Sequence, residues 1–141
     1  MPTPCPLCTP TNEDLLWQDP FCRIILVDDP AYPGFCRVIL NAHIKEMTDL
    51  SSADQQRLMS VVFAVESAVR EVMQPDKINL ASLGNMVPHL HWHVIPRFRE
   101  DKHFPDAIWA APRREGAMRG DAALRPRLIE QLRQRLPSAA G

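Results

Sequence analysis

Apolar residues divide the chain into short strand-like runs separated by turn signals. Residues 22–27 and 35–40 are short apolar runs rich in β-branched side chains, and the sequence Asp28-Asp29-Pro30 ends the first of them. We expect these two runs to be neighbouring antiparallel strands. Residues 77–82 and 88–96 are expected to form two further strands.

Two longer segments show the spacing of an amphipathic helix. In residues 51–73, apolar side chains recur every three or four positions, at Leu58, Val61, Val62, Val65, Val69 and Val72. Ser51 or Ser52 can cap this helix, because Asp54 follows Ser51 by three residues. A second helix is expected over residues 121–136, with one face formed by Leu124, Leu128, Leu132 and Leu136. Since strands and helices do not alternate regularly, we expect an α+β domain built on an antiparallel sheet.

Composition narrows the classes of function. The chain has 141 residues, 45% of them hydrophobic and 23% charged, and a formal net charge of -1. This length suits one domain, and the charge balance argues against a nucleic-acid binder, which needs a basic face. No apolar run approaches the ~20 residues of a membrane span, and the N-terminus lacks the features of a signal peptide. We therefore expect a cytoplasmic protein that binds neither nucleic acid nor membranes.

The four cysteines are expected to stay reduced in such a compartment. Cys22 and Cys36 lie within apolar strand runs, so we expect them in the core. Cys5 and Cys8 form a CxxC pair, which by itself is typical of half a zinc site or of a redox pair. A redox pair usually sits between a strand and a helix, and no such junction is expected here.

Three of the five histidines, His89, His91 and His93, alternate with apolar residues. Successive side chains of a strand point to opposite faces, so these imidazoles share one face. The pattern would arise on a solvated edge strand, but His-x-His on a strand is also a good zinc chelate. At ~3.3 Å per residue, His89 and His93 lie ~13 Å apart, so one metal ion cannot bind both. At least one imidazole therefore has another role. His103 lies beyond this run and is expected in an exposed loop.

Residues 89–95 resemble the motif of the histidine-triad (HIT) family, in which three histidines alternate with hydrophobic residues. Gly84 stands five residues before His89, where the family has a loop glycine, and Gly34 and His43 match a family pattern of glycine, apolar strand and histidine. The resemblance implies a HIT-like antiparallel sheet with one long helix and a C-terminal helix. It places a HIT domain at residues 1–110 and an extension of the same domain at residues 111–141.

The resemblance also implies a mechanism, that of the bacterial diadenosine tetraphosphate hydrolase-like members. The middle histidine, here His91, would attack the α-phosphorus of a nucleotide and form a covalent nucleotidyl-histidine, from which water releases the mononucleotide. This is nucleophilic catalysis, in which one difficult displacement becomes two easier ones. His93 is placed to donate hydrogen bonds to the non-bridging phosphate oxygens, and His89 completes the catalytic triad.

Further residues would hold the substrate. Backbone amides of Gly84, Asn85 and Met86 could bind phosphate. Many family members have Ser or Thr where this chain has Met86, which cannot donate the hydrogen bond that serves the phosphate and the leaving group. Asn79 is preferred over Ser82 as the polar phosphate contact. Asp28 resembles the acid that contacts the ribose, although a simple turn before Pro30 also explains it.

The metal ligands are likewise implied by the resemblance. Some bacterial HIT proteins, and the related galactose-1-phosphate uridylyltransferases, bind zinc through a CxxC pair, the upstream histidine and the first triad histidine. The corresponding ligands here are Cys5, Cys8, His43 and His89. Two thiolates and two imidazoles make a closed tetrahedral site of the structural type. A divalent cation bound with the substrate is also compatible with the family chemistry.

Four functions remain open from the sequence. The leading one is hydrolysis of dinucleoside polyphosphates such as diadenosine tetraphosphate. The others are a nucleoside phosphoramidase, a zinc hydrolase in which His89 and His91 hold a catalytic metal, and a non-catalytic nucleotide-binding protein. A homodimer is expected, since one helix over one sheet leaves an open sheet edge. The alternative is a monomer in which residues 121–136 cover the exposed surface.

Overall fold

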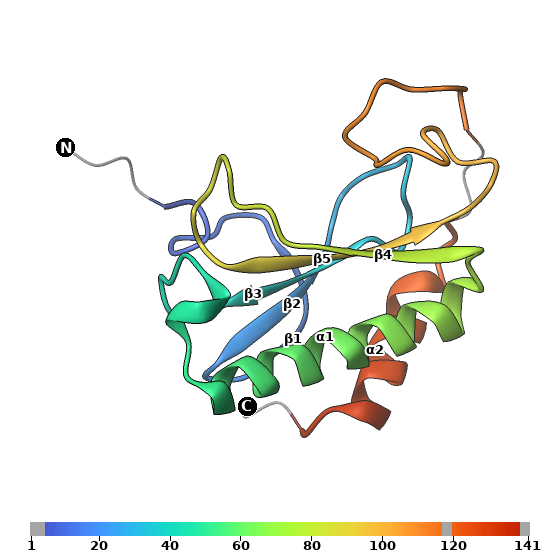
Figure 1. Cartoon of the computed structure of the whole chain (residues 1–141). Helices are drawn as coiled ribbons and strands as arrows, with labels where there is room; N and C mark the ends of the chain where they lie inside the picture. The colour runs from blue at the N-terminus through green and yellow to red at the C-terminus, as the bar shows by residue number, and fades with distance from the viewer. Residues whose placement is uncertain (1–4, 117–119, 139–141) are drawn as a thin grey trace.

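The computed structural model describes residues 5–116 and 120–138. The expected domain ranges 1–110 and 111–141 therefore lie in part outside the described residues, at 1–4, 117–119 and 139–141. The described chain folds into a five-stranded antiparallel sheet in the order β1-β2-β3-β5-β4, with both α-helices on one side of it (Figure 1). The α+β fold predicted from the sequence is confirmed.

The strands are β1 (Asp14–Gln18), β2 (Cys22–Leu26), β3 (Cys36–Leu40), β4 (Lys77–Ala81) and β5 (His91–Arg97). The helices are a short 3₁₀ turn (Met47–Asp49), α1 (Ser52–Met73) and α2 (Leu124–Arg135). None of the described helices combines the length and apolarity that a membrane crossing requires.

Helix α1 begins and ends as its sequence predicts. Ser51 is the N-cap, and its side chain accepts a hydrogen bond from the backbone N–H of Asp54 at 3.2 Å. Gln74 ends the helix in the left-handed conformation directly before Pro75, which cannot continue it. All six predicted stripe residues are buried. The stripe therefore packs the helix onto the sheet.

One strand and two element starts differ from the sequence predictions. Strand β1 was not predicted, because its five residues show no clear alternation. Strand β5 begins at His91 instead of residue 88, since Leu90 donates its N–H to Ile44 beyond β3 and His89 precedes the ladder. Helix α2 begins at Leu124 instead of residue 121, because the Asp121 carboxylate accepts the N–H of Ala123 in a turn.

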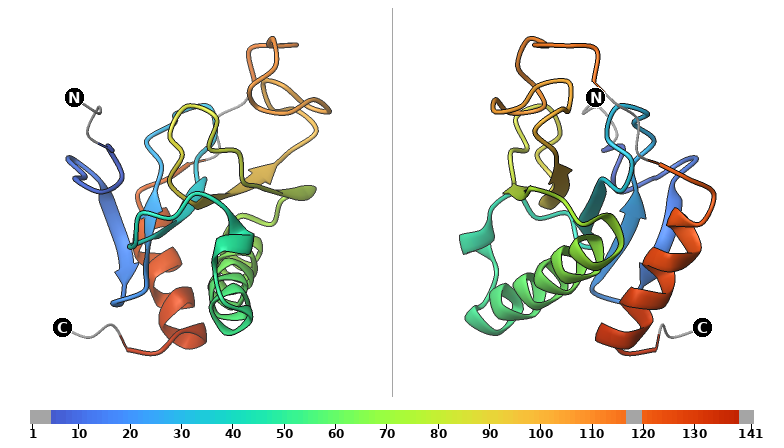
Figure 2. Two further views of the ribbon diagram at one scale, coloured as in Figure 1. Left: turned by 60° about the vertical axis from the view of Figure 1, so that its left-hand side comes forward. Right: turned by 90° about the vertical axis from the view of Figure 1, so that its right-hand side faces the viewer.

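The two faces of the sheet have different contents. Alternate residues of the three central strands, such as Ile24, Val38 and Val94, pack beneath the helices in the main core, which also holds Cys22 and Cys36. The intervening residues, including the paired Arg37 and His93, point to the other face. Figure 2 shows the helices on one side of the sheet and the long connecting loops gathered on the other. We call this second side the loop face.

Buried polar contacts anchor residues 98–116 over the loop face. Arg97 forms an ion pair with Asp101, with Nε and Oδ2 2.8 Å apart, and both side chains are almost fully buried. Burial alone would raise the pKa of Asp101, but Arg97 and backbone N–H groups hold it well below its usual range. His103 is buried and lies 2.6 Å from the Tyr32 hydroxyl, so the prediction of an exposed loop position was wrong. The local sequence contains no signal of this distant partner.

Candidate functional site

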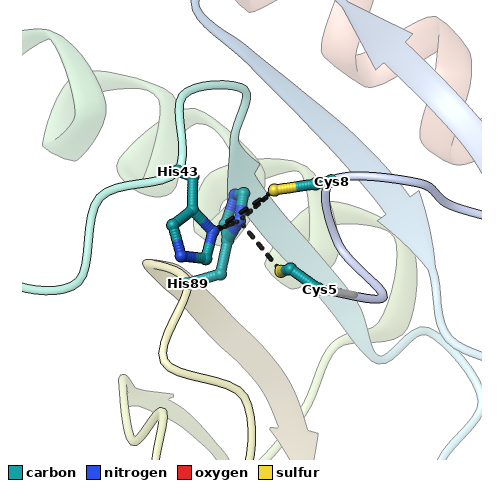
Figure 3. A group of neighbouring side chains, drawn as sticks. All are labelled: Cys5, Cys8, His43 and His89. Atoms are coloured by element: carbon teal, nitrogen blue, oxygen red, sulfur yellow. Dashed lines mark hydrogen bonds between the residues drawn. The ribbon is translucent and has the colours of Figure 1, made fainter. Parts of the chain in front are cut away.

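Two cysteines and two histidines from distant parts of the chain converge at one end of the loop face (Figure 3). Cys5 and Cys8 lie in a turn closed by a 3.1 Å hydrogen bond from the Cys8 N–H to the Cys5 carbonyl. His43 follows β3, and His89 directly precedes β5. Their four ligand atoms all lie within 4.8 Å of one another. The structure therefore assembles a group that could bind a metal ion, from the four residues that the resemblance implied.

The sheet supports this group from below. The buried Arg23 side chain on β2 pairs with Glu13 at 2.8 Å and donates to the Leu7 carbonyl at 2.9 Å, which holds the CxxC turn against the loop face. The pKa of Cys5 is lowered: burial works against the thiolate, but the backbone N–H groups of Leu7 and Cys8 outweigh it. A thiolate is the form that binds a metal ion.

His89 is fully buried and uses both ring nitrogens. Its Nδ1 faces the sulfur atoms of Cys5 and Cys8, at 3.4 and 3.5 Å, while its Nε2 lies 2.6 Å from the carbonyl oxygen of Leu40. A carbonyl oxygen only accepts, so Nε2 carries the hydrogen and Nδ1 keeps its lone pair. Burial is the main cause that lowers the pKa of His89, which favours the neutral ring. His89 is therefore oriented as a ligand rather than toward the other two histidines of the motif.

His91 is oriented by the backbone of His89. Its Nδ1 lies 2.6 Å from the His89 carbonyl oxygen, so Nδ1 donates and Nε2 keeps its lone pair. His91 is buried, with 9% of the residue exposed, at the first position of β5. Ser82, the residue after β4, donates its hydroxyl to the His91 carbonyl at 2.7 Å and joins the loop to the strand here. An imidazole with one free basic nitrogen can act as a nucleophile or as a base.

His93 has the opposite tautomer. The Nε of Arg37 donates to its Nδ1 at 3.2 Å, so the hydrogen of the neutral ring is on Nε2. Burial first, then the charge of Arg37 and the nearby His91, lowers the pKa of His93 to about 4. The His91 and His93 rings meet edge to face, with centroids 5.0 Å apart. The pair thus offers one acceptor nitrogen and one donor N–H side by side.

The loop formed by Gly84, Asn85 and Met86 was expected to bind phosphate beside these rings. Gly84 has a φ of 76°, which favours glycine, but Asn85 and Met86 are exposed, and Met86 is 95% exposed. Among the described residues, no hydrogen bond joins Gly84, Asn85 or Met86 to His91 or His93. The loop is attached to this pair through Ser82 instead.

The two other expected substrate residues lie on either side of the histidines. Asn79 on β4 faces the loop side, but its amide oxygen accepts from Arg97 at 2.7 Å, a contact that the sequence did not indicate. Asp28 is exposed and lines a cavity of about 410 Å³ whose walls include Ile25, Val27 and Arg37. Arg37 both lines this cavity and contacts His93, whereas neither His91 nor His93 lines it.

Two residues near His93 were not among the predicted site residues. Arg37 is the one charged side chain in its apolar strand run, and strand alternation alone could have placed it on the histidine face. Trp109 lies with its ring centroid 5.2 Å from that of His93 and is 51% exposed. Nothing in the sequence indicated its position, because the buried contacts that anchor residues 98–116 join residues far apart.

Comparison with known proteins places this arrangement in a family. The HIT domain model matches residues 9–100 of the chain. The chain is similar to AP-4-A phosphorylase of Mycobacterium tuberculosis, 27% identical over 81 residues that cover 53% of this chain and 42% of that protein. It is also similar to bis(5'-adenosyl)-triphosphatase of Saccharomyces cerevisiae, 24% identical over 94 residues that cover 62% and 46%. These matches span less than half the length of either relative.

Solved structures match more of the chain. A histidine triad protein from Bradyrhizobium japonicum is 29% identical, with a TM-score of 0.70 over 86% of this chain and 90% of that one. A histidine triad protein from Marinobacter aquaeolei is also 29% identical, with a TM-score of 0.72 over 87% and 92%. The CxxC pair precedes the segment that the domain model matches, so the group that could bind a metal ion combines residues inside and outside it.

The His93 geometry predicts a histidine that stays neutral where ordinary histidines titrate. Its ring NMR resonances should not move between about pH 5.5 and pH 8. Removing a nearby positive charge raises a histidine pKa, so Arg37→Leu should shift the His93 midpoint upward, toward the ordinary value of 6.5. Arg57→Leu, a change on α1 beneath the sheet, should leave it in place. A midpoint near 6.5 in the unaltered protein would contradict the assignment.

Proposed function

This chain belongs to the HIT domain family, and we propose that it is a nucleotide hydrolase or transferase that acts at the α-phosphate of dinucleoside polyphosphates through His91. The observation that carries the proposal is the 2.6 Å hydrogen bond from His91 Nδ1 to the His89 carbonyl, which leaves Nε2 as a free nucleophile. The bond also fixes the ring orientation before substrate arrives, so no tautomer exchange is needed for attack.

The chemistry needs two steps at the same atom. In the first, His91 Nε2 forms a bond to the α-phosphorus while the bond to the leaving-group oxygen breaks, and the bonding electrons go to that oxygen. In the second, the oxygen of a water molecule bonds to the phosphorus while the P–N bond breaks. The bonding electrons return to His91 Nε2, the water loses a proton to solvent, and the mononucleotide is released. His93 supports both steps, because its Nε2–H can donate to a phosphate oxygen on which negative charge grows.

The nucleoside would occupy the cavity beside Arg37. Ile25 and Val27 offer an apolar wall for a base, and the exposed Asp28 can accept hydrogen bonds from ribose hydroxyls. Asn79 keeps its amide NH₂ group for a phosphate contact, since only its oxygen is bonded to Arg97. Gly84, Asn85 and Met86 would contact the phosphates through backbone N–H groups, as would suit a loop whose side chains are exposed.

The comparisons favour dinucleoside polyphosphates over the other substrates. The two curated relatives are an AP-4-A phosphorylase and a bis(5'-adenosyl)-triphosphatase. A phosphoramidase would use the same His91 step on a P–N bond and remains the second candidate. A zinc hydrolase using both His89 and His91 is disfavoured, because His89 Nδ1 faces the cysteines while His91 Nδ1 donates to the His89 carbonyl.

Loss of the nucleophile should abolish turnover without loss of the fold. His91→Ala should lower kcat on diadenosine tetraphosphate by roughly a thousandfold or more, because the covalent route disappears. Acid-quenched unaltered enzyme should carry a nucleotidyl group on His91, as detected by mass spectrometry. The variant should keep its melting temperature and bind adenosine monophosphate. Turnover close to that of the unaltered enzyme would refute the mechanism, and an adduct on another residue would reassign the nucleophile.

We further propose that the metal is one structural zinc ion. Tetrahedral zinc with Zn–N bonds of ~2.05 Å and Zn–S bonds of ~2.3 Å requires N–N and S–N separations of about 3.3 and 3.6 Å. The Nδ1 atoms of His43 and His89 lie 3.2 Å apart. The sulfur of Cys5 lies 3.4 Å from His89 Nδ1, and the sulfur of Cys8 lies 3.2 and 3.5 Å from the Nδ1 atoms of His43 and His89. The Leu40 carbonyl, which accepts from His89 Nε2, supplies the outer hydrogen bond that usually orients a metal-bound histidine.

Zinc content and stability should depend on the CxxC pair. The purified protein should hold about one zinc ion per chain, and Cys5→Ala or Cys8→Ala should lose it and lower the melting temperature, since a closed site contributes to folding. Cys36→Ala, which removes a buried thiol beneath the sheet, serves as the control and should keep the zinc. Elemental analysis that finds no zinc in protein prepared without chelators would contradict the proposal.

We also propose a homodimer that pairs through the β4 edge. The edge strands of the sheet are β1 and β4, and α2 packs against α1 and β1, so β4 is the edge farther from α2. Beside β4, a shallow cavity joins Glu66 and Arg70 of α1 to Lys77 and Ile78. Phe63, one turn earlier on α1, is 52% exposed. Apolar surface next to an open edge is typical of an interface.

The oligomeric state should respond to a charge at this surface. Light scattering should give a mass near twice 16.0 kDa at micromolar concentration, and Phe63→Glu should shift it toward the single-chain value. Arg133→Glu places the same charge on an exposed position of α2 and should leave the mass unchanged. A single-chain mass for the unaltered protein would reject the dimer.

The cytoplasmic location and the single domain formed by residues 1–110 and 111–141 stay predictions of the sequence.

A further inference from the structure

Arg37 differs from the other arginines on the loop face of the sheet in its ion pairing. Three arginines, Arg23, Arg37 and Arg97, point to this face from β2, β3 and β5. The outer two form close ion pairs, Arg23 with Glu13 and Arg97 with Asp101, each at 2.8 Å. Among the residues that the structure describes, no carboxylate lies within ion-pair distance of Arg37.

The surroundings of Arg37 make this lack of a partner costly. Its side chain is half-buried, with the guanidinium carbon 5.5 Å from the centre of the Phe35 ring. Burial lowers the pKa of the guanidinium, against the opposing effect of Asp29 and Glu13 at longer range. A charge removed from water is unfavourable unless an opposite charge or hydrogen bonds replace the water. The Arg37 guanidinium is therefore suited to bind an anionic group of a substrate.

The hydrogen bonds of Arg37 show which atoms remain for that anion. Guanidinium has five N–H donors, and the one on Nε is committed to His93 Nδ1 at 3.2 Å. Among the described residues, none accepts a hydrogen bond from the four donors on the two terminal nitrogens. Arg37 lines the same cavity as Asp28 and bonds to His93 through its Nε. A planar pair of NH₂ groups matches two oxygens of one phosphate.

We propose that Arg37 is a catalytic residue of this enzyme, binding the non-bridging oxygens of the α-phosphate through its terminal nitrogens while its Nε holds His93 in place. The inference rests on the proposed nucleotidyl transfer by His91. As His91 Nε2 bonds to the phosphorus and the leaving-group oxygen departs with its electron pair, Arg37 stabilises the charge on the oxygens that stay, and it transfers no proton. Arg37 thereby supplies a side-chain hydrogen-bond donor for the phosphate, which Met86 cannot supply.

Binding without turnover separates this role from a structural one. In a His91→Ala background, calorimetry should compare adenosine monophosphate with adenosine, which lacks the phosphate. Arg37→Gln should weaken binding of the monophosphate roughly 10- to 100-fold, as expected for loss of charge-assisted hydrogen bonds, with adenosine changed less than about twofold. Arg37→Lys keeps the charge and should recover part of the loss. Arg57→Gln, on α1 beneath the sheet, is the control and should alter neither affinity.

Turnover then tests the catalytic part. With His91 restored, Arg37→Gln should slow the formation of the His91 adduct from diadenosine tetraphosphate about 100-fold or more. Arg37→Lys should recover part of this rate. Equal weakening of monophosphate and adenosine, or no weakening of either, would overturn the inference while leaving the His91 mechanism intact. If the His91→Ala protein binds neither ligand, the proposed nucleotide function fails and this inference fails with it.

Discussion

His89 joins the candidate metal ligands to the histidine pair, and the geometry of both depends on it. Its side chain points toward Cys5 and Cys8, while its backbone carbonyl accepts from His91 Nδ1. The Leu40 carbonyl at the end of β3 fixes the ring from behind at 2.6 Å. Movement of this one residue would therefore alter the ligand set and the tautomer of His91 together. A metal ion held here would act on the chemistry only through position.

The sheet separates packing from chemistry by strand alternation. Residues facing the helices form an apolar core, so the strands are held in register by burial. The loop face then carries polar and charged side chains that would be costly in that core. Two of them, Arg23 and Arg97, pair with acids from flanking segments and so fasten those segments over the sheet. Arg37 lies between them on β3, where the histidine pair and the cavity wall meet.

The covering segments form the site although they have little regular structure. Residues 98–116 stay in place through Arg97, Asp101, Tyr32 and His103, which bond to one another beneath them. Trp109 reaches the His93 ring as a result. The turn that carries Cys5 and Cys8 is held from β2 in the same way. In both cases a buried arginine on a rigid strand positions a loop, which suits a site that needs fixed distances.

Local backbone periodicity explains what the sequence alone determined. Alternation along residues 89–95 and the three- to four-residue spacing of residues 51–73 follow from strand and helix geometry, so the histidine face and α1 were predictable, and the family motif added the four potential ligands. Only the tertiary structure decided four features. These are strand β1, the burial of His103, the bond between Asn79 and Arg97, and, among the described residues, the lack of a carboxylate within ion-pair distance of Arg37. Each depends on partners far apart in the chain, and no local pattern records which residues meet after folding.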